Sequence, residues 1–278
     1  MTAKLTFCGG AGSVTGANFL FDTGTAQILV DCGTLAQERT CDDANFEQFQ
    51  YDPKTIKALI VTHAHADHIG RIPKLVRDGF HGTIYSTGAT KDLAAVMFDD
   101  ALGIMEQEVI RHGCDMLYEK EDAERAVHLW KSCDYHAPFS IDDVSVEFLD
   151  AGHILGSALV KLTRNGRTII FTGDLGNTPE PLLCDTESPE GAHYIVMESV
   201  YGDRLHEGRE ERKEHLRQHV EDIRNRNGTL LIPSFSLERT QVLLYELNDM
   251  VESGAMKPIP IFLEHLSPTG VLSVSRWF

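Results

Sequence analysis

A cluster of four metal-binding side chains directly follows a long apolar segment, and this pairing most constrains the fold. The segment Ile56–Thr62 is almost uninterrupted in apolar residues, as is typical of a strand buried on both faces. The next six residues hold the cluster: His63, His65, Asp67 and His68. Imidazole nitrogens and carboxylate oxygens are zinc ligands, and a rigid strand end keeps them in place. The sequence therefore predicts a zinc-binding loop at the end of a buried strand.

Two further residues occupy the same kind of position. His153 follows an alternating strand expected over 144–149, and Asp174 follows a buried strand expected over 167–172. Glycines beside both residues allow the backbone and a metal ion to approach closely. Together with the loop, these residues make six ligands, which is enough for two metal ions with Asp174 as a bridge.

The rest of the chain alternates strands with helices and contains no repeats or low-complexity linkers. The expected strands cover residues 5–8, 17–21, 27–31, 56–62, 144–149, 167–172, 194–197, 229–233 and 259–263, and the expected helices cover 88–111, 120–130, 207–226 and 238–253. This order predicts an α/β fold with two sheets and helices outside them. The pattern changes near residue 204, so we expect a domain boundary at Leu205.

The composition limits the environment and the partners. The formal net charge of −17 argues against a nonspecific nucleic-acid-binding protein, because phosphate contacts need clustered lysines and arginines. It leaves open an enzyme that acts on nucleic acid, since bound divalent metals can reverse the local field. No apolar run is long enough to span a bilayer, and the N-terminus lacks an apolar signal core. We therefore expect a cytoplasmic protein without membrane contact, with its six cysteines reduced.

The ligand pattern resembles that of the metallo-β-lactamase superfamily: His63-x-His65-x-Asp67-His68 with His153 and Asp174. Further motifs are similar to its β-CASP branch, namely Gly12–Asn18, Val30–Gly33, Gly152–Ser157, Glu198–Arg204 and Leu231–Gln241. Members of that branch are nucleases that process RNA and DNA. The resemblance covers residues 4 to 263. It implies a metallo-β-lactamase αββα sandwich over 1–204, followed over 205–278 by the beginning of an α/β β-CASP domain.

The resemblance also implies a two-zinc site. It assigns ligands to the two ions: His63, His65 and His153 to the first, and Asp67 and His68 to the second. Asp174 would bridge the two zinc ions together with a hydroxide. Two metals lower the pKa of bound water and clamp the attacking and leaving oxygens of an in-line displacement.

Two acidic residues receive catalytic roles from the resemblance. Asp67, a ligand beside the water, would accept its proton. Glu198 matches a family carboxylate that orients a catalytic histidine, and the alternative is an ordinary carboxylate at a strand end. We expect Asp31 to fix the metal loop through hydrogen bonds rather than to bind a metal. Di-iron redox relatives carry a carboxylate at the position of His65, so a hydrolytic zinc site fits this chain better.

The pattern breaks near the end of the chain. Residues 259–263 fit a family strand, but 264–278 fit no family segment, and a truncated or frameshifted reading frame explains this most simply. In the family, the chain that follows supplies a last metal-binding histidine, the catalytic histidine and the closing strands of the sandwich. We therefore expect a weakened second zinc site, one tightly bound zinc, poor solubility and feeble nuclease activity.

The leading hypothesis is a zinc-dependent hydrolase of the RNA-processing nuclease type, which attacks phosphodiester bonds with a metal-activated water. Its expected substrate is RNA, with DNA as the alternative, while the cleavage mode and a homo-oligomer are left open. Two other interpretations remain: a catalytically impaired zinc-binding scaffold that pairs with an active homologue, and a small-molecule ester or thioester hydrolase of the same fold. The intact ligand set argues against the scaffold, whereas the missing family segments after residue 263 argue for it. The stretch Glu198–Arg204 argues against the small-molecule hydrolase.

Overall fold

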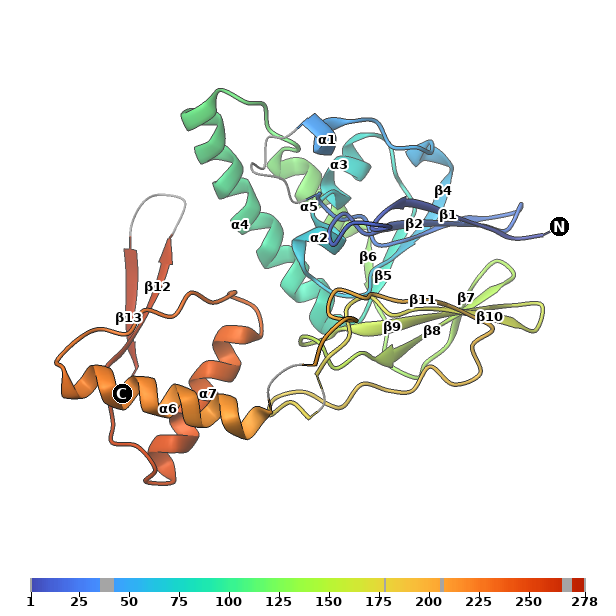
Figure 1. The fold of residues 1–278 in the computed structure, drawn as a ribbon. Coiled ribbons are helices and arrows are strands. Elements are labelled where there is room, and N and C mark those ends of the chain that lie inside the picture. Colours follow the sequence, from blue (N-terminus) through green and yellow to red (C-terminus); the bar gives the residue numbers. More distant parts are fainter. Residues whose placement is uncertain (1, 36–42, 178, 206–207, 267–271, 278) are drawn as a thin grey trace. The chain divides into compact units, whose positions relative to one another are not determined.

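The computed structural model describes residues 2–35, 43–177, 179–205, 208–266 and 272–277 (Figure 1). Its internal contacts divide the chain into two units, Met1–Glu198 and Ser199–Phe278. This division falls close to Leu205, where the sequence predicts a boundary. That each unit is a separate functional domain stays a prediction.

The first sheet holds the metal-loop strand near its centre. Within the described residues it has six strands: β1 (Lys4–Gly9), β2 (Asn18–Asp22), β3 (Gln27–Val30), β4 (Ile56–Ile60), β5 (Thr83–Ser86) and β6 (Trp130–Ser132). The strands β1, β2 and β3 form an antiparallel meander, and β3 to β6 run parallel. The strands expected over 17–21 and 27–31 thus form a hairpin. A parallel strand is covered on both faces, which explains the apolar sequence of β4.

The second sheet carries the other two predicted ligand positions. Among the described residues it has five strands in the order β11-β10-β9-β8-β7: β7 (Phe139–Ile141), β8 (Val144–Asp150), β9 (Ala158–Arg164), β10 (Arg167–Phe171) and β11 (Tyr194–Val196). The strands β7 to β10 are antiparallel, and β11 pairs parallel with β10. Because β8 and β10 both pair antiparallel with β9, they run in the same direction and end at the same edge.

A shared core joins the two sheets into a sandwich. Ile28 and Ile60 from the first sheet pack with Phe148, Val160 and Phe171 from the second, and all five side chains are buried. The alternating sequence of β8 turns every second residue into this core. The predicted α/β sandwich is therefore confirmed.

Helices cover the outer face of the first sheet. Those of the first unit are α1 (Asp43–Phe46), the 3₁₀ turn η1 (Pro53–Thr55), α2 (Ala66–Ile69), α3 (Ile72–Arg77), α4 (Gly88–His112) and α5 (Lys120–His128). Figure 1 shows α3 and α5 on the side of the first sheet turned away from the second sheet. Over the second sheet, Leu175 and Ala192 from a connecting segment pack against Leu159 and Ile170. In the described part of this unit, that face has a loop cover and no helix.

The second unit contains α6 (Arg209–Asn225), α7 (Arg239–Glu252) and the antiparallel strands β12 (Ile261–Leu266) and β13 (Leu272–Trp277). Val220 of α6 and Leu247 of α7 meet in a small apolar core. The strand predicted over 229–233 is wrong, because these residues pair with no strand in the described part of the chain. Leu231 is 82% exposed there.

The structure bears on two expectations, the absence of membrane contact and the reduced state of the cysteines. None of the described helices has the length and hydropathy needed to cross a membrane. Cys114 is disulfide-bonded, so the prediction of six reduced thiols is wrong for this residue. The thiols of Cys8, Cys32, Cys133 and Cys184 are free.

Candidate metal centre

The candidate ligands come together from three chain segments at the ends of strands. His63 and His65 follow β4, and His65 is the N-cap of the short helix α2, which carries the next two candidates. His153 follows β8 and Asp174 follows β10, at the shared edge of the second sheet. The sandwich therefore brings together positions that lie more than a hundred residues apart in sequence.

Four of these residues form a compact cluster. Ligand atoms of His63, His65, His153 and Asp174 all lie within 4.8 Å of one another. Nδ1 of His65 is 3.1 Å from Nε2 of His63 and 3.2 Å from Nε2 of His153. Four ligands placed tetrahedrally at zinc–nitrogen distances would lie about 3.3 Å apart. The spacing of the cluster therefore fits one zinc ion.

The carboxylate of Asp174 faces two sides. Its Oδ2 lies 3.7 Å from Nε2 of His63 and 3.4 Å from Nε2 of His153. Its Oδ1 lies 3.2 Å from Nε2 of His68, which in turn is 3.9 Å from Oδ2 of Asp67. The structure thus brings all six predicted ligands together, with Asp174 between the compact cluster and the pair Asp67 and His68.

Asp31 anchors the candidate metal loop through buried hydrogen bonds. It is fully buried at the end of β3, where it adopts a left-handed backbone conformation with φ of 57°. Its Oδ1 accepts a hydrogen bond from the backbone N–H of Thr62 at 2.8 Å, and its Oδ2 lies 2.8 Å from both the Thr62 hydroxyl and Nδ1 of His68. This is the role predicted for Asp31, and it leaves Nε2 of His68 facing Asp174.

The electrostatic environment favours neutral imidazoles in the compact cluster. Burial and the neighbouring imidazoles lower the pKa of His63 well below its usual value. Burial lowers the pKa of His153 to about 4, against the opposing charge of Asp174. His68 differs: burial lowers its pKa, but Asp31 and Asp174 outweigh burial and raise it to about 10. Neutral imidazole is the form that binds metals, so the donor chemistry of the compact cluster suits zinc.

The second set of donors is smaller. It consists of His68, Asp67 and the second oxygen of Asp174. Burial raises the pKa of Asp67, although the nearby charge of His68 lowers it. A carboxylate–histidine–carboxylate set also fits zinc, with fewer protein donors than the first set provides.

Glu198 lies beside this centre rather than in it. Its Oε1 accepts a hydrogen bond from the backbone N–H of Leu175 at 3.3 Å, and its own N–H donates to the hydroxyl of Thr172. Leu175 directly follows Asp174. These two contacts tie Glu198 to the backbone of Leu175 after Asp174 and to the side chain of Thr172 before it.

Two features of the centre were missed in the sequence. Thr62 contacts both Asp31 and His63, yet its position suggests only the last residue of a strand. Gly33 allows two chain segments to touch: a Cβ atom there would lie 1.5 Å from the carbonyl oxygen of Asp67. The only sequence signals were the place of Thr62 directly before His63 and the place of Gly33 at the end of the motif Val30–Gly33.

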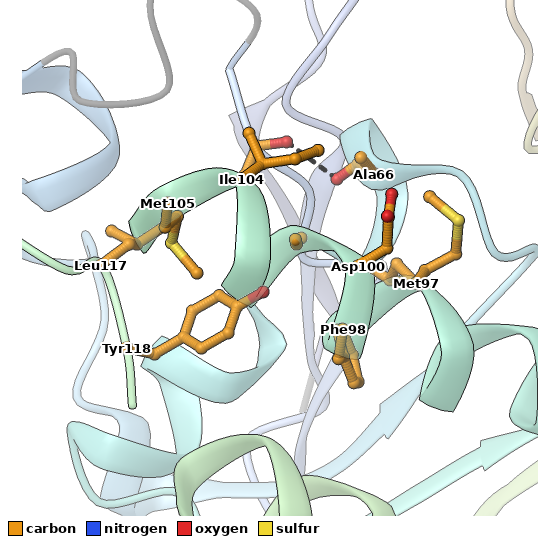
Figure 2. A pocket seen from close by; sticks show the side chains of 12 residues that line it. Ala66, Met97, Phe98, Asp100, Ile104, Met105, Leu117 and Tyr118 are labelled. Carbon is orange, nitrogen blue, oxygen red and sulfur yellow. Dashed lines mark hydrogen bonds between the residues drawn. The ribbon is translucent and has the colours of Figure 1, made fainter. Parts of the chain in front are cut away.

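An apolar cavity of about 150 Å³ lies behind the metal loop (Figure 2). Its walls come mainly from α4 and include Phe98 and Met105, with Tyr118 beside them. Ala66 and Ile69 of α2 close it on the side of the metal loop. None of the six candidate ligands lines this cavity. The cavity is therefore separate from the candidate metal centre.

Comparison with known proteins connects this geometry to a family. Residues 4–204 match the family model described as anti-Pycsar protein Apyc1. Ribonuclease TTHA0252 of Thermus thermophilus is 34% identical over 266 residues, which cover 96% of this chain and 59% of the relative. Transcription termination factor FttA of Methanocaldococcus jannaschii is 31% identical over 94% of this chain and 41% of its own length.

A solved structure shows the same fold. A protein of unknown function from Enterococcus faecalis has a TM-score of 0.53 at 15% sequence identity, over 91% of this chain and 63% of that protein.

The chain spans 59% of the length of the Thermus thermophilus relative and 41% of that of the Methanocaldococcus jannaschii relative. The family model matches this chain only up to Arg204. Over residues 4–204 the chain belongs to the family described as anti-Pycsar protein Apyc1, and its two-sheet sandwich with the His/Asp cluster is that of the metallo-β-lactamase fold.

Proposed function

We propose that this chain is a metal-dependent ribonuclease that hydrolyses phosphodiester bonds in RNA with a metal-activated water. Two lines of support lead to this proposal. The donor set of the candidate centre suits zinc. Among the relatives, the Thermus thermophilus protein is named as a ribonuclease. RNA as substrate therefore rests on the relatives, and hydrolysis rests on the centre.

Each predicted ligand has a place in this proposal. The compact cluster would hold the first zinc through His63, His65, His153 and Oδ2 of Asp174. The second zinc would lie between Asp67, His68 and Oδ1 of Asp174. Because fewer protein donors surround it, we expect the second zinc to bind more weakly than the first.

The observation that carries the proposal is the division of the Asp174 carboxylate between the two donor sets. When bound, the two metals supply a water of lowered pKa and charge compensation for the attacking and leaving oxygens. Asp174 would help to hold both ions, whereas a site for a single ion would need only one of its oxygens.

The protein groups around the metals have supporting roles in the proposed reaction. Asp67 would accept the proton of the attacking water, the role that the family resemblance implies for it. Glu198 would keep Asp174 in place through the N–H of Leu175. The orientation of a catalytic histidine by Glu198, which the family resemblance implies, stays a prediction.

The test is cleavage of end-labelled RNA by the purified 278-residue chain. We expect cleavage that a chelator abolishes and added zinc restores, and that His63→Ala lacks. The matched control His81→Ala, at an exposed histidine outside the centre, should cleave like wild type. Parallel reactions with single-stranded DNA and with a thioester distinguish the alternative substrates. A zinc-loaded chain that leaves RNA intact, or a His63→Ala variant as active as wild type, would overturn the proposal.

A further inference from the structure

The hydroxyl of Thr62 lies between a buried carboxylate and a metal-loop histidine. Its Oγ1 is 2.8 Å from Oδ2 of Asp31 and 3.0 Å from Nδ1 of His63. All three side chains are buried, with exposures of 1% or less. Water therefore does not compete for these hydrogen bonds, and the donors and acceptors must satisfy one another.

The hydrogen-bond protons among Asp31, Thr62 and His63 can be placed in only one way. A carboxylate only accepts hydrogen bonds, so the single proton of the Thr62 hydroxyl goes to Asp31. Toward His63 the hydroxyl can then only accept, and Nδ1 of His63 must donate. A neutral imidazole carries one N–H, so its Nε2 keeps a lone pair. This nitrogen faces the compact cluster, 3.1 Å from Nδ1 of His65.

We propose that Thr62 is a positioning residue that fixes His63 in the tautomer with its proton on Nδ1 and its lone pair directed at the metal position. The charge of Asp31 acts on His63 through this hydroxyl. Any effect of Thr62 on zinc affinity rests on the proposed metal-binding role of His63. The position of the proton on the His63 ring does not depend on that role.

Oδ2 of Asp31 also orients the ring of His68, which belongs to the second set of donors. Oδ2 of Asp31 lies 2.8 Å from Nδ1 of His68, which must donate to it. Nε2 of His68 is then the nitrogen that faces Oδ1 of Asp174. One buried carboxylate thus presets both histidines, His68 directly and His63 through Thr62.

Packing keeps the Thr62 side chain in this position. Its backbone N–H donates to Oδ1 of Asp31, and its carbonyl oxygen accepts from the N–H of Ala158 at 2.8 Å, which links the two sheets. The chain at Gly173 passes so close that a Cβ atom there would lie 2.7 Å from Cβ and Oγ1 of Thr62. The hydroxyl therefore has little freedom to turn away from Asp31 and His63.

The test compares Thr62→Val, which keeps the shape and removes the hydroxyl, with Thr62→Ser, which keeps the hydroxyl. Thr168→Val is the matched control, because it removes a buried hydroxyl that pairs with Thr163 far from the metal loop. Long-range proton–nitrogen NMR on the metal-free chain, labelled with ¹⁵N-histidine and assigned with His63→Gln, reports which ring nitrogen carries the proton. Chelator competition then gives the zinc affinity of each variant.

We expect the proton of His63 on Nδ1 in wild type, Thr62→Ser and Thr168→Val, and a shift toward Nε2 in Thr62→Val. Zinc affinity should fall about 10- to 100-fold in Thr62→Val and stay within about threefold of wild type in the other two variants. A wild-type chain with the proton on Nε2 overturns the proposal, even if Thr62→Val does not fold. So does a Thr62→Ser variant that behaves like Thr62→Val. A shifted tautomer with unchanged zinc affinity would instead contradict the proposed metal role of His63.

Discussion

Oδ1 of Asp174 lies 3.2 Å from Nε2 of His68, while the other oxygen of the same carboxylate faces the compact histidine cluster. The two oxygens therefore serve different donor sets. This arrangement depends on the sandwich, because Asp174 follows a strand of one sheet and His68 follows a strand of the other. The contact between these two residues is the structural basis of the proposed two-metal centre.

Asp174→Asn should separate the two metal sites. An amide has one oxygen, so the variant can serve one donor set but cannot bridge both. We expect the affinity for the second zinc to fall at least about tenfold while the first zinc is retained. Zinc content after desalting, measured by mass spectrometry, checks this. Asp115→Asn, at an exposed aspartate, is the matched control, and equal zinc content in both variants would contradict a bridge.

His153→Ala should remove tight zinc binding. The substitution deletes one of the four donors of the compact cluster. We expect the affinity for the first zinc to fall by more than about a hundredfold, beyond the effect of losing a supporting residue. Chelator competition measures the affinity, and His81→Ala controls for the loss of a histidine. Unchanged zinc affinity in His153→Ala would show that this histidine is not a ligand.

Asp31→Asn should destabilise the metal-free protein. Asp31 accepts hydrogen bonds from the N–H and hydroxyl of Thr62 and lies within bonding distance of His68. An amide replaces one acceptor oxygen by a donor, which leaves a buried donor without its partner. We expect a loss of about 1–3 kcal/mol in the free energy of unfolding. Urea denaturation with a chelator present measures it, and a change as small as that of Asp115→Asn would rule out this anchoring role.

Gly33→Ala should disturb the metal loop through the backbone. The added Cβ would lie 1.5 Å from the carbonyl oxygen of Asp67, so one of the two segments has to move. We expect at least about 2 kcal/mol of lost stability together with weaker zinc binding. Gly88→Ala, where the nearest atom would be 3.8 Å away, should change stability by less than about 0.5 kcal/mol. Similar thermal unfolding of the two variants would refute the close approach.

The strand ends that carry the candidate ligands could be predicted because they depend on local sequence. The apolar run before His63 marks a buried strand, and the residue types after it determine the chemistry. The long helix was predicted over 88–111 and is observed as Gly88–His112, since its apolar spacing is also a local signal.

What could not be predicted depends on tertiary partners. The sequence expected the second helix to reach Trp130, but Trp130 begins β6, where its indole N–H donates to the hydroxyl of Ser86 in the neighbouring strand. The segment 229–233 has the composition of a strand but lacks a pairing partner among the described residues. Asp174 faces both donor sets only because the two sheets pack at a certain distance. That distance cannot be predicted from a local sequence pattern.

We propose that His63, His65, His153 and Asp174 together hold a zinc ion. Anomalous X-ray diffraction at the zinc edge, from crystals of the 278-residue chain grown with zinc, would locate that ion. We expect the strongest peak about 2.0–2.2 Å from Nε2 of His63, Nδ1 of His65, Nε2 of His153 and Oδ2 of Asp174. We also expect a weaker peak next to His68 on the other side of Asp174. Zinc bound elsewhere in the chain, with no peak among these four residues, would refute the proposed site.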